Sequence, residues 1–206
     1  MGVEGYKTIA YEIAEAMAWK VPDWCAVPVC YGDSLYGMWK GFEELHALGW
    51  TDRVPRFLAA EVSGSLVQAM AAQTDQPPVC ERASASIATS IGAAQATFQG
   101  VAALRASNGR AVFVADEDIM AWQAKLGRVE GVYAEPAAVA TLPAIARLRA
   151  DGTIAQDATV VALLTAPGLK DPAATERMLA PGPLIAGNLD AAVRALKDSY
   201  GFDAAR

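Results

Sequence analysis

Apolar residues recur at helical spacing near the start of the chain. Ile9, Ile13 and Met17 lie four residues apart with small alanines between them. This spacing predicts an amphipathic helix over residues 7–19. The same reasoning, with short apolar runs taken as strands, predicts a helix from Leu35 to Gly49 and strands over residues 24–29 and 56–62.

The second half of the chain alternates apolar runs with helical patterns. Residues 110–115 form a continuous apolar run, which is typical of parallel strands covered on both faces. Residues 158–165, ATVVALLT, are the most strand-like stretch of the chain. Asp116 is placed to cap a helix, because its carboxylate can accept hydrogen bonds from the free amides of the first turn. The helices predicted here span residues 93–106, residues 117–128, and Glu135 to Arg149.

Strands that alternate with helices at this spacing predict an α/β fold. We expect a three-layer αβα arrangement around a mostly parallel sheet. A chain of 206 residues can bury one substantial core, so we expect a single α/β domain over residues 1–206. Residues 74–86 are rich in turn formers and are expected to form a loop.

Charge and composition narrow the classes of function. The 17 basic and 23 acidic residues give a formal net charge of −6, and without a basic cluster we expect no nucleic-acid partner. The apolar runs are too short to span a bilayer, and the first residues are too polar for a signal peptide, so we expect no membrane partner. Hydrophobic residues make up 53% of the chain and charged residues only 19%, which indicates that some surface is covered.

The cysteines and the single histidine exclude several kinds of site. Cys25, Cys30 and Cys80 form no CxxC pair and leave an odd cysteine, as expected for a protein of the reducing cytoplasm. His46 is the one histidine, so zinc sites with several histidines are excluded and no metal site is expected. A Ser-His-Asp triad would need His46, which lies inside a predicted helix and is expected to be an ordinary surface residue.

A glycine separates the first predicted strand from the helix that follows. In open parallel sheets ligands bind beyond the carboxyl ends of the strands, where helix N-termini present unpaired amides. Gly32 allows the backbone to approach a ligand, and the amides of Asp33, Ser34 and Leu35 can converge on an anion. The alternative is a plain turn in which Asp33 or Ser34 caps the helix. The spacing matches neither GxGxxG nor GxxxxGK[ST], so neither nucleotide fingerprint is supported.

Two further residues are candidates for a site. Thr165 lies at the end of a predicted strand, where its hydroxyl can point into the crevice, and Gly168 follows with a possible unusual turn. The alternative at Thr165 is a strand end followed by an ordinary loop. Glu135 is either a carboxylate in a cavity or an acid of the first helical turn, which the helix dipole favours.

Four segments occur in an order that is known from one enzyme family. They are EGYKTIAYEIAEAM, VPVCYGDSLYGMWKGFEEL, GVYAEPAAVA and LLTAPGLKDP, and they extend from Glu4 to Pro172. Together they resemble the C-terminal part of threonine synthase and its relatives among the fold type II, tryptophan synthase beta-like, pyridoxal-phosphate enzymes. The resemblance implies two α/β domains with pyridoxal 5'-phosphate held between them. This chain would be most of the larger domain.

The resemblance assigns the glycine turn to the phosphate of the cofactor. The residues that would hold it are Gly32, Asp33, Ser34 and Leu35. Cys30 and Asp33 stand where the family has glycine. A carboxylate that faces a phosphate is repelled, so Asp33 is expected to point outward, to cap the helix, or to belong to an altered site.

The resemblance also indicates the type of reaction. Thr165 matches the hydroxyl residue that faces the pyridine nitrogen, and Glu135 is expected to lie near the ring. A neutral hydroxyl does not enforce protonation of that nitrogen, so the ring is a weaker electron sink. Such an environment suits elimination or replacement at the β or γ carbon of small amino-acid substrates, which is lyase or synthase chemistry, more than transamination.

The Schiff-base lysine of the family lies in a segment that precedes the part matched here. Lys170 matches the GLKD element, which argues against that role, so no catalytic residue is expected in this chain. Three hypotheses follow: a fragment of a longer two-domain enzyme, a half-enzyme subunit that docks on a complementary chain, or a degenerate, non-catalytic protein that binds a phosphorylated ligand. The first two predict an exposed apolar surface, and the third predicts a self-contained monomer or homo-oligomer.

Overall fold

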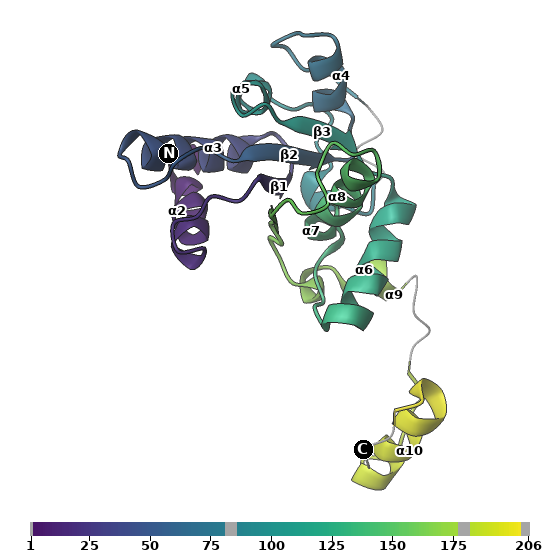
Figure 1. Ribbon diagram of the computed structural model, residues 1–206. Coiled ribbons are helices and arrows are strands. Elements are labelled where there is room, and N and C mark those ends of the chain that lie inside the picture. Colours follow the sequence, from purple (N-terminus) through teal and green to yellow (C-terminus); the bar gives the residue numbers. More distant parts are fainter. Residues whose placement is uncertain (1, 81–85, 177–181, 203–206) are drawn as a thin grey trace. The chain divides into compact units, whose positions relative to one another are not determined.

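Among the residues that the computed structural model describes, which are 2–80, 86–176 and 182–202, four strands form one sheet (Figure 1). The strands are β1 (Trp24–Pro28), β2 (Arg56–Glu61), β3 (Arg110–Phe113) and β4 (Val160–Ala162), in the order β3-β2-β1-β4. Each strand runs parallel to its neighbours. The prediction of an α/β fold with a mostly parallel sheet is thereby confirmed.

Side chains of the two central strands alternate between two hydrophobic clusters. Cys25 and Phe57 point to one cluster, whereas Trp24 and Leu58 point to the other. This is the period of two that a pleated strand imposes. Because both faces of β1 and β2 are apolar, both must be covered by helices, which confirms the predicted three-layer arrangement.

The helices of both outer layers bury apolar side chains against the sheet. One cluster contains side chains from α2 (Lys7–Ala16), α3 (Asp33–Ala47), α4 (Ser65–Ala71) and α5 (Phe98–Ala106). The other contains side chains from α6 (Asp116–Glu130), α7 (Pro136–Val139) and α8 (Thr141–Ala150). Shorter elements are α1 (Gly2–Gly5), η2 (Thr89–Ile91), η3 (Gly168–Lys170) and α9 (Pro172–Glu176).

The two edge strands are shorter than their sequences predict. The predicted strands 158–165 and 110–115 are reduced to the three residues of β4 and the four of β3. In β3, Val112 is buried but Phe113 is 39% exposed, so the expectation of coverage on both faces is wrong there. An apolar sequence alone did not reveal that these strands lie at the edges of the sheet.

Several predicted helices differ in extent from those observed. Ala18 and Trp19 adopt positive φ angles of 52° and 64°, which right-handed helix excludes, so α2 ends before them. The helix predicted over residues 7–19 ends at Ala16, the one over residues 93–106 begins at Phe98, and the one from Glu135 to Arg149 is divided at Ala140 into α7 and α8.

The prediction that Asp116 caps a helix is wrong. Helix α6 begins at Asp116 itself, with Ala115 at the N-cap position. The carboxylate of Asp116 instead accepts hydrogen bonds from the hydroxyl of Ser86 and from the amide of Ile87. It therefore fixes the end of the predicted loop 74–86, of which residues 81–85 lie outside the described residues.

Helix α4, which sequence patterning did not predict, is held by a buried carboxylate. Glu61 ends β2, and its carboxylate accepts hydrogen bonds from the amides of Leu66 at 3.1 Å and Val67 at 2.7 Å. The hydroxyl of Ser63 donates a third at 2.9 Å. Burial raises the pKa of Glu61. The end of the strand therefore supplies the acceptor for the first turn of this short helix.

The chain divides into two compact units, Met1–Pro172 and Ala173–Arg206. The sequence predicts one α/β domain over residues 1–206, whereas the sheet and its covering helices all belong to the first unit. The second unit contains α10 (Leu189–Tyr200), where the side-chain oxygen of Asn188 accepts a hydrogen bond from the amide of Ala191. In the described residues no helix has the length and apolar character required to cross a bilayer.

Close packing of α2 on α3 depends on a glycine. A Cβ atom on Gly41 would lie 2.7 Å from the carbonyl oxygen of Lys7 and 2.8 Å from the Cβ of Ala10. By contrast, a Cβ on the exposed Gly127 of α6 would have only the carbonyl of Val132 nearby, at 3.9 Å.

We therefore expect Gly41→Ala to lower the free energy of unfolding by about 1–3 kcal/mol, because the two helices must separate. The matched control Gly127→Ala should raise it by about 0.5–1 kcal/mol through better helix propensity. Urea denaturation followed by circular dichroism measures both. Equal effects of the two substitutions would contradict the packing described here.

Candidate functional site

Five of the six predicted site residues line one cavity of about 640 Å³. They are Gly32, Asp33, Ser34, Glu135 and Thr165. The cavity lies beyond the carboxyl ends of β1 and β4, where ligands are expected to bind in a parallel sheet. The sixth predicted residue, Leu35, is fully buried in the core, so its side chain cannot face a ligand and only its backbone amide is relevant.

The turn at Gly32 follows β1 and packs against the N-terminus of α5. Gly32 has a φ of 109°, and a Cβ atom there would lie 3.1 Å from the Cα of Gly100. The amide and the hydroxyl of Thr97 both donate to the carbonyl of Tyr31, at 2.8 and 3.0 Å. The turn therefore needs glycine both for its backbone conformation and for its close approach to α5.

The amides in the first turn of α3 have no hydrogen-bond partner among the described residues. The first hydrogen bond of the helix runs from the amide of Tyr36 to the carbonyl of Gly32, at 2.9 Å. In the part of the chain that the structure describes, no side chain caps this helix, so the alternative in which Asp33 or Ser34 is a side-chain cap is not realised. A 15-residue helix with free amides at its N-terminus attracts anions.

The loop after β4 is hydrogen-bonded to the segment that precedes α7. The amide of Glu135 donates to the carbonyl of Ala166 at 3.0 Å, and the amide of Gly168 donates to the carbonyl of Tyr133 at 2.9 Å. These bonds place Thr165 and Glu135 on the same cavity. At Glu135 the structure supports the interpretation as a cavity carboxylate.

Glu135 is buried, with 3% of its surface exposed, and is compensated by an ammonium group. The Nζ of Lys170 lies 3.2 Å from its Oε2. The same Nζ donates to the hydroxyl of Ser90 at 3.1 Å, and that hydroxyl donates to Glu135 at 3.4 Å. Three segments distant in the sequence thus meet in one polar cluster. Among the described residues, Lys170 is the one basic side chain that lines the cavity.

Sequence patterning missed Ser90 and the pairing of Lys170 with Glu135. Ser90 lies on the short helix η2, and no motif in its neighbourhood indicated a site. The sequence assigns Lys170 to the GLKD element, but it does not identify the partner of its ammonium group. Only the burial of Glu135, which demands a compensating charge, could have indicated that pairing.

The histidine and the cysteines lie in ordinary surroundings. The Nδ1 of His46 is 3.0 Å from the carbonyl oxygen of Thr51, outside the cavity. All three cysteines are unpaired, burial raises the pKa of the Cys25 thiol, and Cys30 lines the cavity. Among the described residues, no group of three histidine, cysteine or acidic side chains is arranged to hold a metal ion.

Comparison with known proteins shows similarity to one family over most of the chain. The family model described as "Pyridoxal-phosphate dependent enzyme" matches residues 1–166. Threonine synthase of Methanosarcina acetivorans is 34% identical over 192 residues, which are 92% of this chain and 47% of that protein. Threonine synthase of Mycobacterium tuberculosis is 35% identical over 170 residues, or 82% of this chain and 46% of that protein. The chain spans about half the length of the curated relatives it matches.

Solved structures of low sequence identity share the fold. Maize serine racemase superposes with a TM-score of 0.66 at 16% identity, covering 85% of this chain and 52% of that one. The L-serine ammonia-lyase of Rhizomucor miehei superposes with a TM-score of 0.63 at 19% identity, covering 80% and 51%.

Removal of the Lys170 ammonium is expected to destabilise the fold. Lys170→Met leaves the buried Glu135 carboxylate unpaired, which should lower the free energy of unfolding by about 1–3 kcal/mol. This is less than for a fully buried pair because the Lys170 side chain is 55% exposed. Urea denaturation at neutral pH measures the loss.

The control is Lys170→Arg, which keeps the charge and should cost less. The double variant Glu135→Gln/Lys170→Met should regain part of the stability, because it removes the unpaired charge. If the loss of stability in the double variant equals the sum of the losses in Glu135→Gln and in Lys170→Met, the two groups do not interact.

Proposed function

The chain belongs to the pyridoxal-phosphate-dependent enzyme family, and from this membership we propose that its cavity is the half of a threonine-synthase-like site that holds the phosphate and ring of pyridoxal 5'-phosphate. The observation that carries the proposal is the convergence of Gly32, Asp33, Ser34, Thr165 and Glu135 on one cavity. Its volume of about 640 Å³ lies in the range usual for cofactor pockets.

The turn at Gly32 is suited to a phosphate group. The backbone approaches the cavity without a side chain, and the free amides of Asp33, Ser34 and Leu35 begin a long helix. Asp33 also lines the cavity and places a negative charge in the same turn. We therefore favour, among the three possibilities for Asp33, an altered site in which its carboxylate weakens but does not abolish phosphate binding.

The other end of the cavity is suited to the ring. When bound, the cofactor supplies an electron sink for negative charge at a substrate carbon. The Thr165 hydroxyl is a neutral hydrogen-bonding group for the ring nitrogen, so it leaves that nitrogen without an enforced proton. Glu135, held by Lys170 and Ser90, adds a carboxylate whose charge is already compensated. This arrangement suits elimination or replacement at the β or γ carbon of an amino acid, a lyase or synthase reaction.

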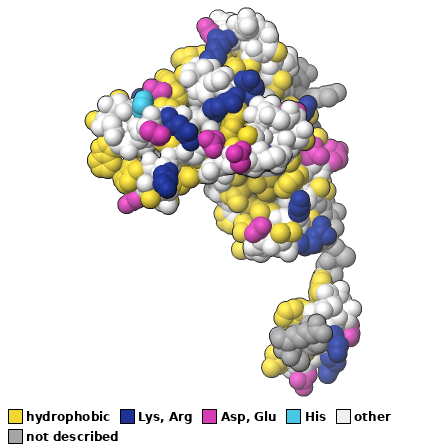
Figure 2. Space-filling view, viewed as in Figure 1, with side chains coloured by type: hydrophobic (Ala, Val, Ile, Leu, Met, Phe, Trp, Pro, Cys, Tyr) yellow, Lys and Arg dark blue, Asp and Glu magenta, His cyan; other side chains and the backbone are white. Residues whose placement is uncertain are grey.

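The amine that binds the cofactor covalently is proposed to come from the part of the relatives that this chain does not match, supplied either by an N-terminal half of the same protein or by a complementary subunit. The similarity to proteins of about twice this length supports that proposal. Large apolar side chains at the cavity are exposed, namely Tyr6, Tyr31 and Leu164, and Figure 2 shows hydrophobic side chains over broad areas of the face in view. Such a surface is expected where another part of a protein packs.

A second candidate function is a non-catalytic protein that binds a phosphorylated ligand. The observation that favours it is the presence of Cys30 and Asp33 on the cavity, at positions where the family resemblance implies glycine. The three free thiols agree with a reducing compartment, which supports our proposal of a cytoplasmic location under either function.

Phosphate recognition at Gly32 is tested by comparing two ligands. The chain should bind pyridoxal phosphate at least about tenfold more tightly than pyridoxal, because only the former reaches the helix amides with a charged group. Gly32→Ala should remove that preference through strain and collision with Gly100. Equilibrium dialysis measures both affinities.

The matched control is Gly64→Ala. Gly64 has a φ of 82° and precedes α4 in the same way, but it lies outside the cavity. It should lose stability yet keep the preference for the phosphorylated ligand. Equal affinity of the unaltered chain for pyridoxal and pyridoxal phosphate would refute the proposal that the turn at Gly32 binds the phosphate group.

Complementation tests the source of the amine. The chain is co-expressed with the N-terminal half of a threonine synthase, supplied with pyridoxal phosphate and reduced with borohydride. Mass spectrometry should find the cofactor fixed to a lysine of the added half. Cofactor fixed instead to a lysine of this chain, and absent from that position in the Lys170→Met variant, would show that Lys170 itself supplies the amine.

A further inference from the structure

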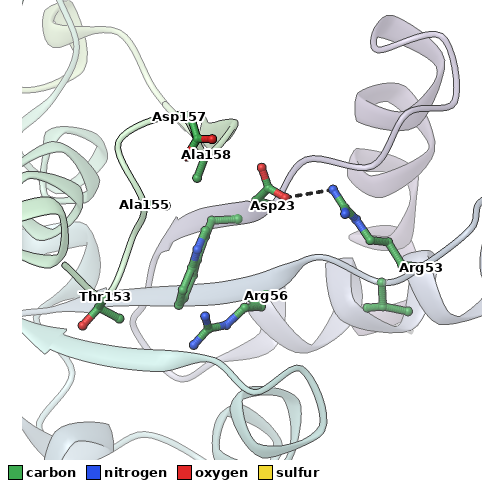
Figure 3. A pocket seen from close by; sticks show the side chains of 9 residues that line it. Asp23, Arg53, Arg56, Thr153, Ala155, Asp157 and Ala158 are labelled. Carbon is green, nitrogen blue, oxygen red and sulfur yellow. Dashed lines mark hydrogen bonds and ion pairs between the residues drawn. The ribbon is translucent and has the colours of Figure 1, made fainter.

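A second cavity lies at the opposite end of the sheet. It has a volume of about 410 Å³ and is lined by residues at the amino ends of β1 and β2 and by the segment 153–158 (Figure 3). The cavity proposed for the cofactor lies beyond the carboxyl ends of the strands, and the two cavities share no lining residue. Any ligand of this second cavity therefore occupies a separate site.

Arg56 is held in one orientation at this cavity. Its Cζ lies 3.9 Å from the ring centroid of Trp24, the neighbouring residue on β1, which is 2% exposed. Its Nε donates to the carbonyl of Asn108 at 3.0 Å. Figure 3 shows the Arg56 side chain among the residues that line the cavity, with its guanidinium extending to the side on which Thr153 lies. Its two terminal nitrogens have no partner among the described residues, so a planar pair of donors remains available.

In the part of the chain that the structure describes, no carboxylate forms an ion pair with Arg56. Arg110 begins the adjacent strand β3, and burial together with the charge of Arg110 lowers the pKa of Arg56. Among the described residues, neither arginine forms an ion pair with a carboxylate. A bound anion beside Arg56 therefore relieves the repulsion between the two cations, in addition to the negative charge that Asp151 already places near Arg110.

The other charged groups of the cavity leave Arg56 as the group that can recognise a ligand. Arg53 is paired with Asp23 at 3.0 Å, and the second oxygen of Asp23 accepts from the amide of Thr159 at 2.8 Å. Asp157 also lines the cavity, and its carboxylate is exposed. The anionic group of a ligand is therefore directed to Arg56, and the rest of the ligand must not add negative charge near Asp157.

We propose that this second cavity binds a small oxyanion, the carboxylate or phosphate group of a small molecule, through two hydrogen bonds from the terminal nitrogens of Arg56. A guanidinium matches either group with two parallel hydrogen bonds. Because Trp24 and Asn108 already hold the Arg56 side chain, little conformational freedom is lost on binding. Arg110 strengthens the attraction without contacting the ligand.

The experiment is a titration of the full chain, free of cofactor, with sodium phosphate and separately with sodium acetate at constant ionic strength. Proton–nitrogen NMR follows the Nε–H signal of Arg56 and the indole signal of Trp24. Both signals should shift and saturate with at least one of the anions, and the stronger of the two identifies the type of ligand. Sodium chloride at the same ionic strength should give no saturable shift.

Variants separate specific binding from general attraction of anions. Arg56→Met keeps the apolar stem on Trp24 and should weaken binding by about tenfold or more, and Arg56→Lys by less, because a lysine lacks the paired donors. Arg110→Met should weaken binding by about two- to fivefold through its longer-range charge. The control is Arg128→Met, since the Nε of Arg128 also donates to a carbonyl but on the exposed surface of α6.

Shifts that rise linearly with both anions would overturn the proposal, and so would a saturable shift of the Trp24 indole signal that persists unchanged in Arg56→Met and Arg110→Met. If Arg56→Met fails to fold, the affinity of Arg110→Met for the anions tests the proposal instead. The Arg110 side chain does not line the cavity, so its removal leaves the lining intact. Preference for pyridoxal phosphate over pyridoxal is measured at the other cavity and should be unchanged in Arg110→Met. Failure of the proposed function and failure of this site are therefore distinguishable.

Discussion

The whole architecture depends on the burial of β1 and β2 from both sides. Their side chains alternate between two hydrophobic clusters, so neither strand can face water on either surface. Covering both faces requires each parallel strand to be followed by a helix that returns the chain to the starting edge. All carboxyl ends of the strands then lie along one edge. For that reason the turn at Gly32 and the residues that follow β4 reach the same cavity.

Sequence reasoning was most successful where local chemistry decides the structure. The apolar runs located all four strands, and the glycine break located the turn because few other residues adopt its conformation. It was least successful where contacts with distant parts of the chain determine the local structure. The shortness of β4, the division of the helix at Ala140 and the actual partners of Asp116 all result from packing against segments far away in the sequence.

The candidate site shows the same contrast between features that local sequence determines and features that distant contacts determine. Gly32, Thr165 and Glu135 could be proposed from strand ends and family resemblance, and they line one cavity. Ser90 could not be proposed, because its position depends on the fold of a segment without a recognisable pattern. The pairing of Lys170 with Glu135 was also beyond reach, since nothing in the sequence shows which carboxylates are buried.

The pairing of β4 with β1 has a consequence for the order of folding. The amide of Thr159 binds the side chain of Asp23 across 136 residues of sequence. Contacts of such long range require closure of a large loop and are among the slowest to form. The cavity beyond β1 and β4 is thus expected to be completed late, after the rest of the sheet. During synthesis on the ribosome, a ligand of that cavity would have no site to bind until nearly all of the first unit had emerged.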